Sequence, residues 1–198
     1  MKVNFKNIFQ FLIIIFFVFI FYSCVNKDKS KEINFITDST KIGIETIDYD
    51  LGIKFNPPKE WELQPSSLSK KMESNSSGNF FYQPIYLFFD KNAKAILSVG
   101  KVQSTDTAIT KSSQINYYKS LLTSKYKNNN LSYVSFTKDK IHFNKINFEK
   151  ENLISLKVIF LNKEDDIIQF DFSFPKDKRE ELISLIQASI GTIETLRK

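Results

Sequence analysis

The chain has 198 residues, of which 42% are hydrophobic and 25% charged, and it contains one Cys and one His. This length and balance exclude a disordered polymer and a multi-span membrane protein, and they leave room for one domain with one packed core. A single Cys and a single His exclude an intramolecular disulfide, a Cys/His zinc cluster and any catalytic relay that bypasses that His. We expect neither a cofactor nor a metal site.

The formal net charge of +6 is almost entirely lysine, because only Arg179 and Arg197 are arginines among the 28 basic residues. Arginine supplies the bidentate contacts that recognise phosphates and guanine edges. We therefore expect no nucleic-acid binding.

The first 23 residues have the pattern of an export signal. Lys2 and Lys6 precede an apolar run from Ile8 to Tyr22, and no acidic residue interrupts it. As a helix, this run reaches only about 22 Å, which is short of the ~30 Å hydrocarbon core of a bilayer. The pattern predicts a signal peptide over residues 1–23 rather than a membrane span.

The only cysteine stands where the apolar run ends. Ordinary signal peptidase prefers small residues at both −1 and −3, and cleavage after Ser23 would put Phe21 at −3. The arrangement of Ser23 and Cys24 resembles a bacterial lipoprotein signal. This resemblance implies cleavage between them, a diacylglyceryl group on the Cys24 sulfur and usually a third acyl chain on its amine, palmitate being one such chain. Two or three chains give lasting attachment to a membrane. The alternative is a free Cys24 in an uncleaved anchor.

The segment 24–41 is polar, charged and without a clear period, so we expect a flexible tether that carries the lipidated Cys24. Residues 42–198 then form the folded domain. This organisation predicts a membrane-anchored protein of the bacterial cell envelope, on its periplasmic or surface face.

The first half of the domain is predicted to contain short strands. Apolar positions indicate a strand over 42–47 and another over 53–55, which Pro57 and Pro58 end. The Ser-rich stretch 64–79 is predicted to be a long loop, where a binding surface is often found. Apolar runs over 80–90 and 95–102 predict a hairpin.

The second half is predicted to contain a helix, four strands and a closing helix. Helical spacing covers 112–127, with Ser112 or Ser113 as N-cap. Strands follow over 131–137, 141–148 with a break near Asn144 and Lys145, 153–161 and 167–174. Residues 177–193 carry an apolar helical stripe, with Asp177 and Glu180 as an N-terminal capping pair. This order indicates an α+β domain on an antiparallel sheet.

The stretch DYDLGIKFNPPKEW at 48–61 is similar to the opening of PsbP-like domains, which form one superfamily with the Mog proteins. The paired strands over 153–174 and the helix after them resemble the end of such domains. The resemblance implies an antiparallel sheet packed between helices, an α-β-α sandwich, and in bacteria many secreted or lipid-anchored members. Gln169, Asp171 and Ser173 alternate with apolar residues and indicate that one face is partly wet, whereas the family covers both faces.

Candidate sites in the domain are few. His142 is expected to face solvent from a strand, with a general base as the alternative. The run of Glu164, Asp165 and Asp166 is interpreted as a solvated turn, because it lacks the spaced ligands and glycine of a calcium loop. Trp61 is expected in the core, with stacking on a ligand as the alternative. We name no catalytic, cofactor-binding or metal-binding residue.

These observations predict a lipid-anchored, non-catalytic module that binds or assembles another envelope protein, through the sheet face or the segment 64–79. The alternative is a small-ligand or lipid carrier with a pocket between sheet and helix, suggested by aromatic residues at 80, 81, 82, 86, 88 and 89. A third hypothesis, a hydrolase, needs clustered carboxylates or His142 in a cleft.

Overall fold

The computed structural model describes residues 31–32, 37–71, 76–106 and 109–197. The predicted signal peptide 1–23, including Ser23, and the predicted lipidation site Cys24 lie outside the described residues. They stay predictions.

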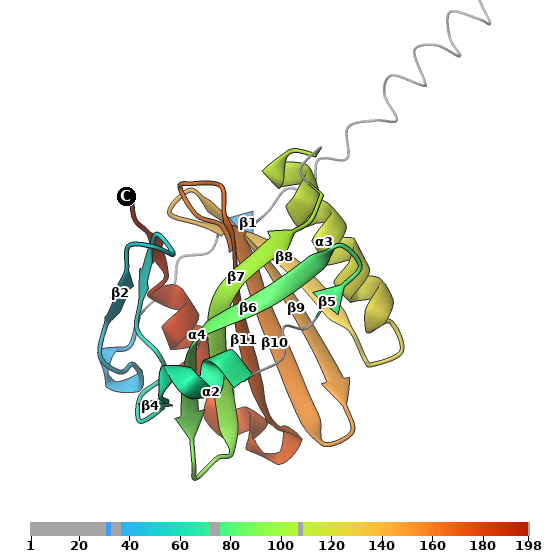
Figure 1. Cartoon of the computed structure of the whole chain (residues 1–198). Coiled ribbons are helices and arrows are strands. Elements are labelled where there is room, and N and C mark those ends of the chain that lie inside the picture. The colour runs from blue at the N-terminus through green and yellow to red at the C-terminus, as the bar shows by residue number, and fades with distance from the viewer. Residues whose placement is uncertain (1–30, 33–36, 72–75, 107–108, 198) are drawn as a thin grey trace, which may run out of the picture. The chain divides into compact units, whose positions relative to one another are not determined.

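A nine-stranded sheet forms the centre of the described part (Figure 1). Its strand order is β1-β8-β9-β10-β11-β7-β6-β4, and β5 also pairs with β6. Every pair is antiparallel except β1 with β8. The strands are β1 (Lys31–Glu32), β4 (Glu62–Leu63), β5 (Ser76–Ser77), β6 (Phe80–Asp90), β7 (Ala95–Ser104), β8 (Ser132–Lys138), β9 (Ile141–Lys150), β10 (Leu153–Leu161) and β11 (Ile167–Pro175).

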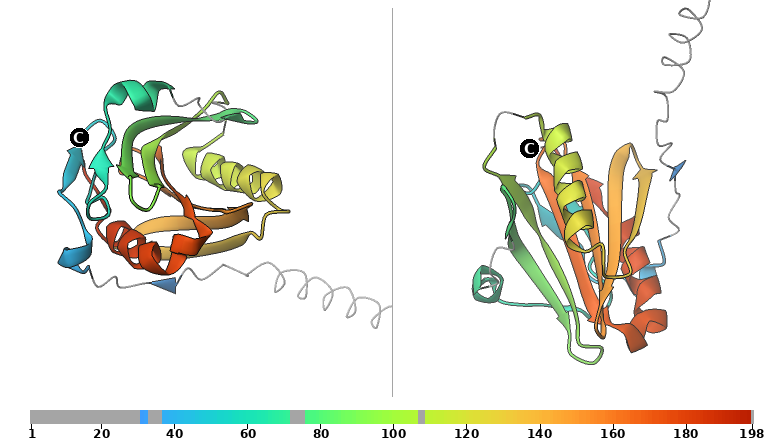
Figure 2. Two further views of the ribbon diagram at one scale, coloured as in Figure 1. Left: turned by 90° about the horizontal axis from the view of Figure 1, so that it is seen from below. Right: turned by 90° about the vertical axis from the view of Figure 1, so that its right-hand side faces the viewer.

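A small second sheet has the order β12-β3-β2. Its strands are β2 (Thr46–Asp48), β3 (Ile53–Phe55) and β12 (Glu194–Thr195). The helical segments are η1 (Ser39–Lys41), α2 (Ser66–Lys71), α3 (Lys111–Lys125), η2 (Lys176–Lys178) and α4 (Arg179–Gly191). Helices α3 and α4 lie on opposite sides of β9, β10 and β11 (Figure 2). The predicted α+β class, with an antiparallel sheet between helices, is confirmed.

Strand β11 shows why the sheet has two covered faces. Side chains alternate along a strand, so even-numbered and odd-numbered residues point to opposite faces. The even-numbered residues join Leu182, Ile186 and Ile190 of α4 in one hydrophobic core. These β11 residues are Ile168, Phe170, Phe172 and Phe174.

The polar residues of β11 point to the α3 side of the sheet and differ in burial. Gln169 is only 1% exposed, and its Oε1 accepts a hydrogen bond of 2.8 Å from the Tyr118 hydroxyl of α3. Asp171 forms an ion pair with Lys157 of β10, which is itself buried. The partner of Gln169 offsets the cost of its burial. Asp171 and Ser173 stay partly exposed, so the face is partly wet at these two positions, as expected, whereas Gln169 is buried and paired.

Several predicted elements differ from the structure. The segment 64–79 is not one long loop, because it contains α2 and β5. Within the expected tether 24–41, β1 pairs with β8 and η1 forms a short turn. The first strand is shorter than predicted and covers only β2, while Ile42 makes an isolated bridge with Pro58. Strand β9 continues through Asn144 without the predicted break.

Both predicted helix caps are wrong. The N-cap of α3 is Thr110, whose hydroxyl accepts a hydrogen bond of 3.3 Å from the Ser113 backbone N–H. The helix thus begins before Ser112 and Ser113 can act as caps. At α4 the 3₁₀ turn η2 comes first, and the side chain of the N-cap Lys178 makes no capping hydrogen bond; its ammonium donates to Glu181 instead. Asp177 and Glu180 therefore do not form a capping pair.

Within the described residues, no helix combines the length and the apolar character needed to cross a membrane.

Candidate functional site

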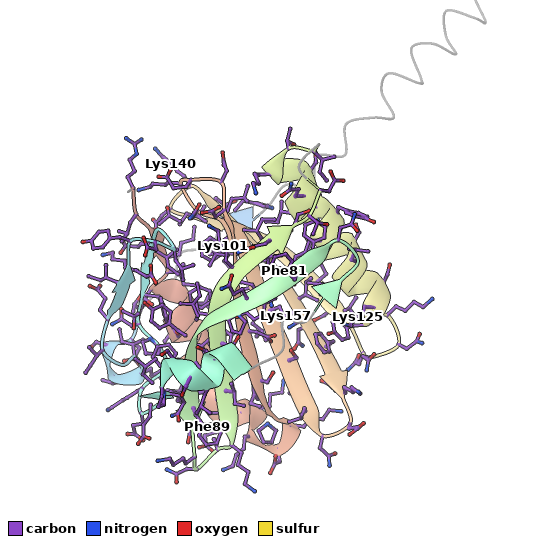
Figure 3. All side chains as sticks on the ribbon, in the orientation of Figure 1. Phe81, Phe89, Lys101, Lys125, Lys140 and Lys157 are labelled. Carbon is purple, nitrogen blue, oxygen red and sulfur yellow. The ribbon has the colours of Figure 1, made fainter. Side chains whose placement is uncertain are left out.

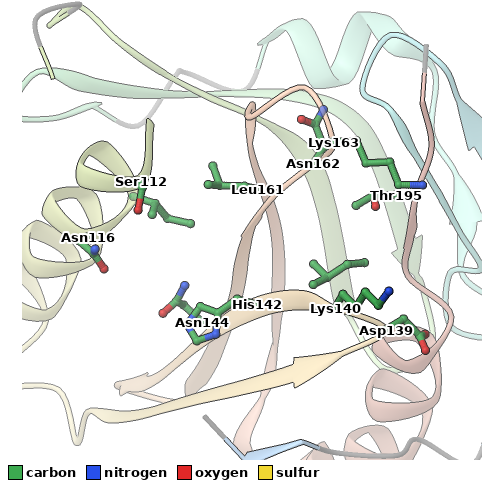
Figure 4. A pocket seen from close by; sticks show the side chains of 12 residues that line it. Ser112, Asn116, Asp139, Lys140, His142, Asn144, Leu161, Asn162, Lys163 and Thr195 are labelled. Carbon is green, nitrogen blue, oxygen red and sulfur yellow. The ribbon is translucent and has the colours of Figure 1, made fainter. Parts of the chain in front are cut away.

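A groove with a volume of about 760 Å³ lies between the N-terminal half of α3 and the sheet (Figure 4). We call it the α3 groove. Helix α3, the β8–β9 turn, β9, the β10–β11 turn and β12 all contribute to its lining. The lining residues are Ser112, Ile115, Asn116, Asp139, Lys140, Ile141, His142, Asn144, Leu161, Asn162, Lys163 and Thr195.

The α3 groove exists because the residues of β9 change character along one face. Ile146 and Phe148 belong to the apolar cluster that α3 covers with Tyr118 and Leu122. Two and four residues nearer the start of β9, the same face carries Asn144 and His142. The helix packs over the apolar part of this face and leaves the polar part as the floor of the groove.

Asn144 is the buried polar residue of this floor, with an exposed fraction of 2%. Its Oδ1 accepts hydrogen bonds from the hydroxyls of Tyr133, at 2.7 Å, and Ser135, at 3.3 Å, both on β8. The Tyr133 hydroxyl in turn accepts a hydrogen bond of 3.0 Å from the Lys119 ammonium of α3. Two donors thus hold the amide oxygen, which fixes the orientation of the amide group.

The amide nitrogen of Asn144 points toward the groove (Figure 4). No hydrogen bond from this nitrogen to the described part of the chain occurs. The chain of bonds from Lys119 through Tyr133 polarises the amide and strengthens its N–H groups as donors. The floor of the groove therefore presents an oriented donor to any ligand that fills it.

Two lysines lie on the far side of the groove from α3. Lys140 and Lys163 are on the same side as Thr195, opposite Ser112 and Asn116 of α3 (Figure 4). Asp139 supplies the only carboxylate among the described lining residues, and it forms an ion pair of 2.6 Å with Lys138. The lining is consequently rich in hydrogen-bond donors and carries an excess of positive charge.

His142 lines the same groove and is exposed, as expected. Partial burial, and then the nearby Lys119 ammonium, lower the pKa of His142 from its ordinary value. The described part of the chain supplies no side-chain hydrogen bond or ion pair to this imidazole. A general base needs an orienting partner of this kind, so the arrangement favours a neutral imidazole that contacts a ligand.

Asn162 lines the groove but has a structural role. Its Nδ2 donates to the Leu51 carbonyl at 2.8 Å, and its Oδ1 accepts from the backbone N–H groups of Glu164 and Asp166. Asp166 also forms an ion pair of 2.7 Å with Lys101. The acidic run at 164–166 is thus built around a turn. Within the described residues, no group of three Asp, Glu, His or Cys side chains has the arrangement of a metal site.

A second cleft, of about 720 Å³, lies between the small sheet and β4. We call it the Trp61 cleft. Trp61 itself is packed in the core edge-to-face against Phe172, as expected, and its indole N–H has no partner in the described part. Ile44 and Leu63 in the lining are 90% and 58% exposed. The lining residues are Gly43, Ile44, Glu45, Thr46, Pro57, Glu60, Trp61, Glu62, Leu63 and Phe88.

The aromatic residues that suggested a carrier pocket do not line the α3 groove. Phe80, Tyr82 and Phe88 belong instead to the two hydrophobic clusters. The sequence gives no direct pointer to Asn144, Lys140 or Lys163 as one site, because they come from separate turns and strands. The predicted strand break near Asn144 is the sequence feature that coincides with the groove.

No family model matches the sequence, and no curated protein matches it. Among solved structures, the chain is similar to cyanobacterial PsbP from Synechocystis sp. PCC 6803, with a TM-score of 0.49 and 14% identity over 81% of this chain and 96% of that one. It is also similar to LpqN, described as involved in cell envelope biogenesis of Mycobacterium tuberculosis, with a TM-score of 0.43 and 13% identity over 78% of this chain and 85% of that one. At these identities and TM-scores the likeness identifies neither a ligand nor an activity.

Proposed function

We propose that this chain is a non-catalytic binding protein of the bacterial cell envelope, anchored by lipid on Cys24, whose α3 groove holds a small polar ligand. The signal-like residues 1–23 and the position of Cys24 support the location. The groove supports the binding role, because its volume of about 760 Å³ falls in the range of ligand sites. Of the two roles expected from the sequence, this favours the ligand carrier.

The observation that carries the binding role is the amide of Asn144. Its Nδ2 faces the groove and forms no hydrogen bond with the described residues, so a ligand acceptor would meet a free donor there. Tyr133 and Ser135 hold the amide oxygen, so the amide cannot satisfy its N–H groups by turning over. The side chain is therefore preorganised for an acceptor that comes from outside the protein.

The composition of the groove supports a non-catalytic role. Hydrolysis by paired carboxylates needs two acids on one cavity, and Asp139 is the only one in the described lining. Lys138 holds that carboxylate in an ion pair. The remaining polar groups are donors, hydroxyls and amides, which recognise a ligand without activating a nucleophile.

The binding role is tested by calorimetry on the full chain in neutral detergent micelles. The probes are N-acetylglucosamine, glucose 1-phosphate and glucosamine, which share a sugar body and differ in charge. We expect saturable binding of at least one probe, weakened about tenfold by Asn144→Asp, which keeps the acceptor for Tyr133 and removes the donor. Asn128→Asp, an exposed amide with the same charge change, is the control. Binding by none of the probes, or equal weakening by both variants, contradicts the role.

The anchor is tested by Cys24→Ser. We expect the variant to leave membranes on carbonate washing, because the acyl chains supply the attachment. Mass spectrometry of the wild-type chain should find a modified Cys24 at the amino terminus. A variant that stays bound, or an unmodified terminus at Met1, would show that the anchor is not lipid on Cys24.

A second candidate function is the docking of a protein partner in the Trp61 cleft. Three carboxylates, from Glu45, Glu60 and Glu62, line this cleft beside the exposed Ile44, and the described lining contains no basic residue. Glu45 and Glu62 form ion pairs with Lys54 and Lys91 outside the cleft, so Glu60 beside Ile44 is the group that would complement a partner segment with an apolar side chain next to Lys or Arg. It would give the protein-binding role expected from the sequence.

Photo-crosslinking in cells tests the docking candidate, with the crosslinker placed at Leu63 or, as a control, at Tyr117, an exposed aromatic residue on α3. We expect a crosslinked partner only from Leu63, with the crosslink mapped to a basic, apolar segment. No crosslink, or the same products from both positions, would contradict it.

A further inference from the structure

We infer that the ligand of the α3 groove carries an anionic group, a phosphate or a carboxylate, that binds between Lys140 and Lys163. This inference rests on the binding role proposed above and adds the chemical class of the ligand. Both lysines line the groove on the same side (Figure 4). Lysine is a common phosphate ligand in proteins, and two of them beside one cavity favour an anion there.

The pairing of the neighbouring lysines strengthens this assignment. Lys101 forms an ion pair of 2.7 Å with Asp166, and Lys138 forms one of 2.6 Å with Asp139. Lys140 and Lys163 have no ion pair with the described residues. Asp139 and Asp166 are thus occupied by other lysines. Glu164 and Asp165, which follow Lys163, form no ion pair with the described residues, so neither groove lysine is neutralised by a direct partner there.

Lys140 lies in the tight turn between β8 and β9. Asp139 and Lys140 form the two-residue turn between β8 and β9, with φ of 49° and 67°. Such turns favour glycine at the second position, because a side chain there strains the backbone. Lys94 and Glu151 also have positive φ in other turns, so the backbone alone does not distinguish Lys140; what distinguishes it is that its side chain lines the groove.

The other side chains that line the groove indicate the chemistry of the rest of the ligand. Asn144 presents donors from the floor, on the opposite side of the cavity from Thr195, and Ser112 and Asn116 add a hydroxyl and an amide from α3 (Figure 4). These groups suit a body with several oxygen acceptors and hydroxyls. Ile115, Ile141 and Leu161 supply apolar contact on the walls. The ligand is therefore an extended, oxygen-rich molecule with its acid at one end.

The anchor would place this groove near the membrane. Lys31 of β1 is only seven residues after Cys24, a reach of about 24 Å at full extension. Lys31 pairs with Phe136, three residues before Asp139 of the groove. Both a phospholipid headgroup and a free phosphorylated or carboxylated molecule are within reach of such a site.

The test is calorimetry on the full chain in neutral detergent micelles, with inorganic phosphate and acetate as anionic probes and N-acetylglucosamine as the neutral probe. The groove variant is the double substitution Lys140→Gln and Lys163→Gln. The matched control is Lys127→Gln and Lys150→Gln, two exposed lysines without ion pairs in the described part, outside the groove lining, which change the net charge equally.

We expect phosphate or acetate to bind saturably and the groove variant to weaken this binding about tenfold, while the control changes it less than about twofold. Equal weakening in both variants would show a general charge effect and overturn the inference. Binding of N-acetylglucosamine without any binding of the anions would overturn the inference but leave the proposed function intact. Failure of all three probes, together with glucose 1-phosphate and glucosamine, would overturn both.

The source of the anion is resolved with the chain reconstituted in nanodiscs of phosphatidylcholine alone or with phosphatidylglycerol. If phosphatidylglycerol competes with added phosphate, and the groove variant removes that competition, the anion is a lipid headgroup. If phosphate binds equally in both nanodiscs, the anion belongs to a free molecule. Either result keeps the site between Lys140 and Lys163.

Discussion

The two faces of the sheet have nearly opposite chemistry. On the α4 face, β10 and β11 present only apolar side chains, and Phe170 contacts Phe55 and Phe160 edge-on or tilted. On the α3 face the same strands present Lys157, Asp171 and Gln169, each with a polar partner. The α3 face also buries Ile159 and Ile167 of these strands in the second hydrophobic cluster. The α4 face therefore has an apolar core only, while the α3 face combines an apolar core with oriented polar groups that continue into the groove.

The buried tyrosine hydroxyls beneath α3 also have hydrogen-bond partners. Tyr82 and Ser98 share a hydrogen bond of 2.5 Å, and Tyr118 donates to Gln169. Burial is the main cause that raises the pKa of Tyr82 and of Tyr118 well above the ordinary value for tyrosine. Both hydroxyls therefore stay protonated over the whole physiological range, and Tyr118 acts as a donor to Gln169. Figure 3 shows Lys157, which lies beneath α3. It also shows Lys140 and Phe89, which lie at opposite ends of the sheet.

The largest effect is expected from the α4 face. Phe170 is fully buried, so Phe170→Ala should lower the free energy of unfolding by about 3–5 kcal/mol through lost burial and the cavity that remains. Leu153→Ala, at an exposed position, is the control and should change it by less than about 0.5 kcal/mol. Both values come from urea denaturation. A loss below about 1 kcal/mol for Phe170→Ala would mean that this face does not form the main core.

The next effect concerns the buried ion pair of the α3 face. Lys157→Met leaves the Asp171 carboxylate without its partner and should cost about 3 kcal/mol of unfolding free energy. Adding Asp171→Leu should recover part of this loss, because no charge is then left unpaired. Urea denaturation of the two single variants and the double variant gives the coupling. Additive losses would show that the pair is solvated, and the contrast between the two faces would fail.

A smaller effect on the free energy of unfolding is expected at Lys140, where stability and ligand binding should change in opposite directions. Lys140→Gly should raise the free energy of unfolding by about 0.5–1 kcal/mol, because glycine relieves the positive φ at this turn. Lys94→Gly is the matched control, since Lys94 also has positive φ but lies in the β6–β7 turn. Both should stabilise the chain, and only Lys140→Gly should weaken phosphate binding. If both or neither weaken it, Lys140 has no special role in binding.

The smallest effect is a pH dependence from His142. Its pKa in the folded chain is lowered, so the unfolded chain binds the proton more readily. The stabilising contribution is therefore complete above the unfolded pKa of about 6.5 and declines as the pH falls through the folded pKa. We expect less than about 1 kcal/mol, because solvent screens this exposed imidazole. His142→Gln should flatten the profile of unfolding free energy between pH 5 and pH 8. A chain that gains stability from His142 at acidic pH would indicate an anionic partner for the imidazole.

The strands and the closing helix could be predicted from the sequence because their periods are local. The alternation of Phe170 and Phe172 with Gln169 and Asp171 defines β11 without knowledge of its neighbours. The helix caps could not be predicted, since several polar residues near each start compete and only the path of the chain selects Thr110.

The wrong prediction of a break in β9 has an instructive cause. Asn144 is a polar residue within an apolar pattern, and asparagine has a low propensity for strands. In the structure its amide oxygen is satisfied by Tyr133 and Ser135 of β8, so the strand continues. The residue that disturbed the pattern is the centre of the candidate site. Its partners come from another strand and another turn, and no spacing along the chain reveals that they meet.

The measurement that tests the central claim most directly is the ¹H–¹⁵N spectrum of the Asn144 side-chain amide during titration of the full chain with glucose 1-phosphate in detergent micelles. The assignment comes from comparison with Asn144→Asp. We predict a saturable shift of this amide pair, lost in the double variant Lys140→Gln and Lys163→Gln. An amide pair that does not move while glucose 1-phosphate binds elsewhere, or no binding at all, would contradict the account.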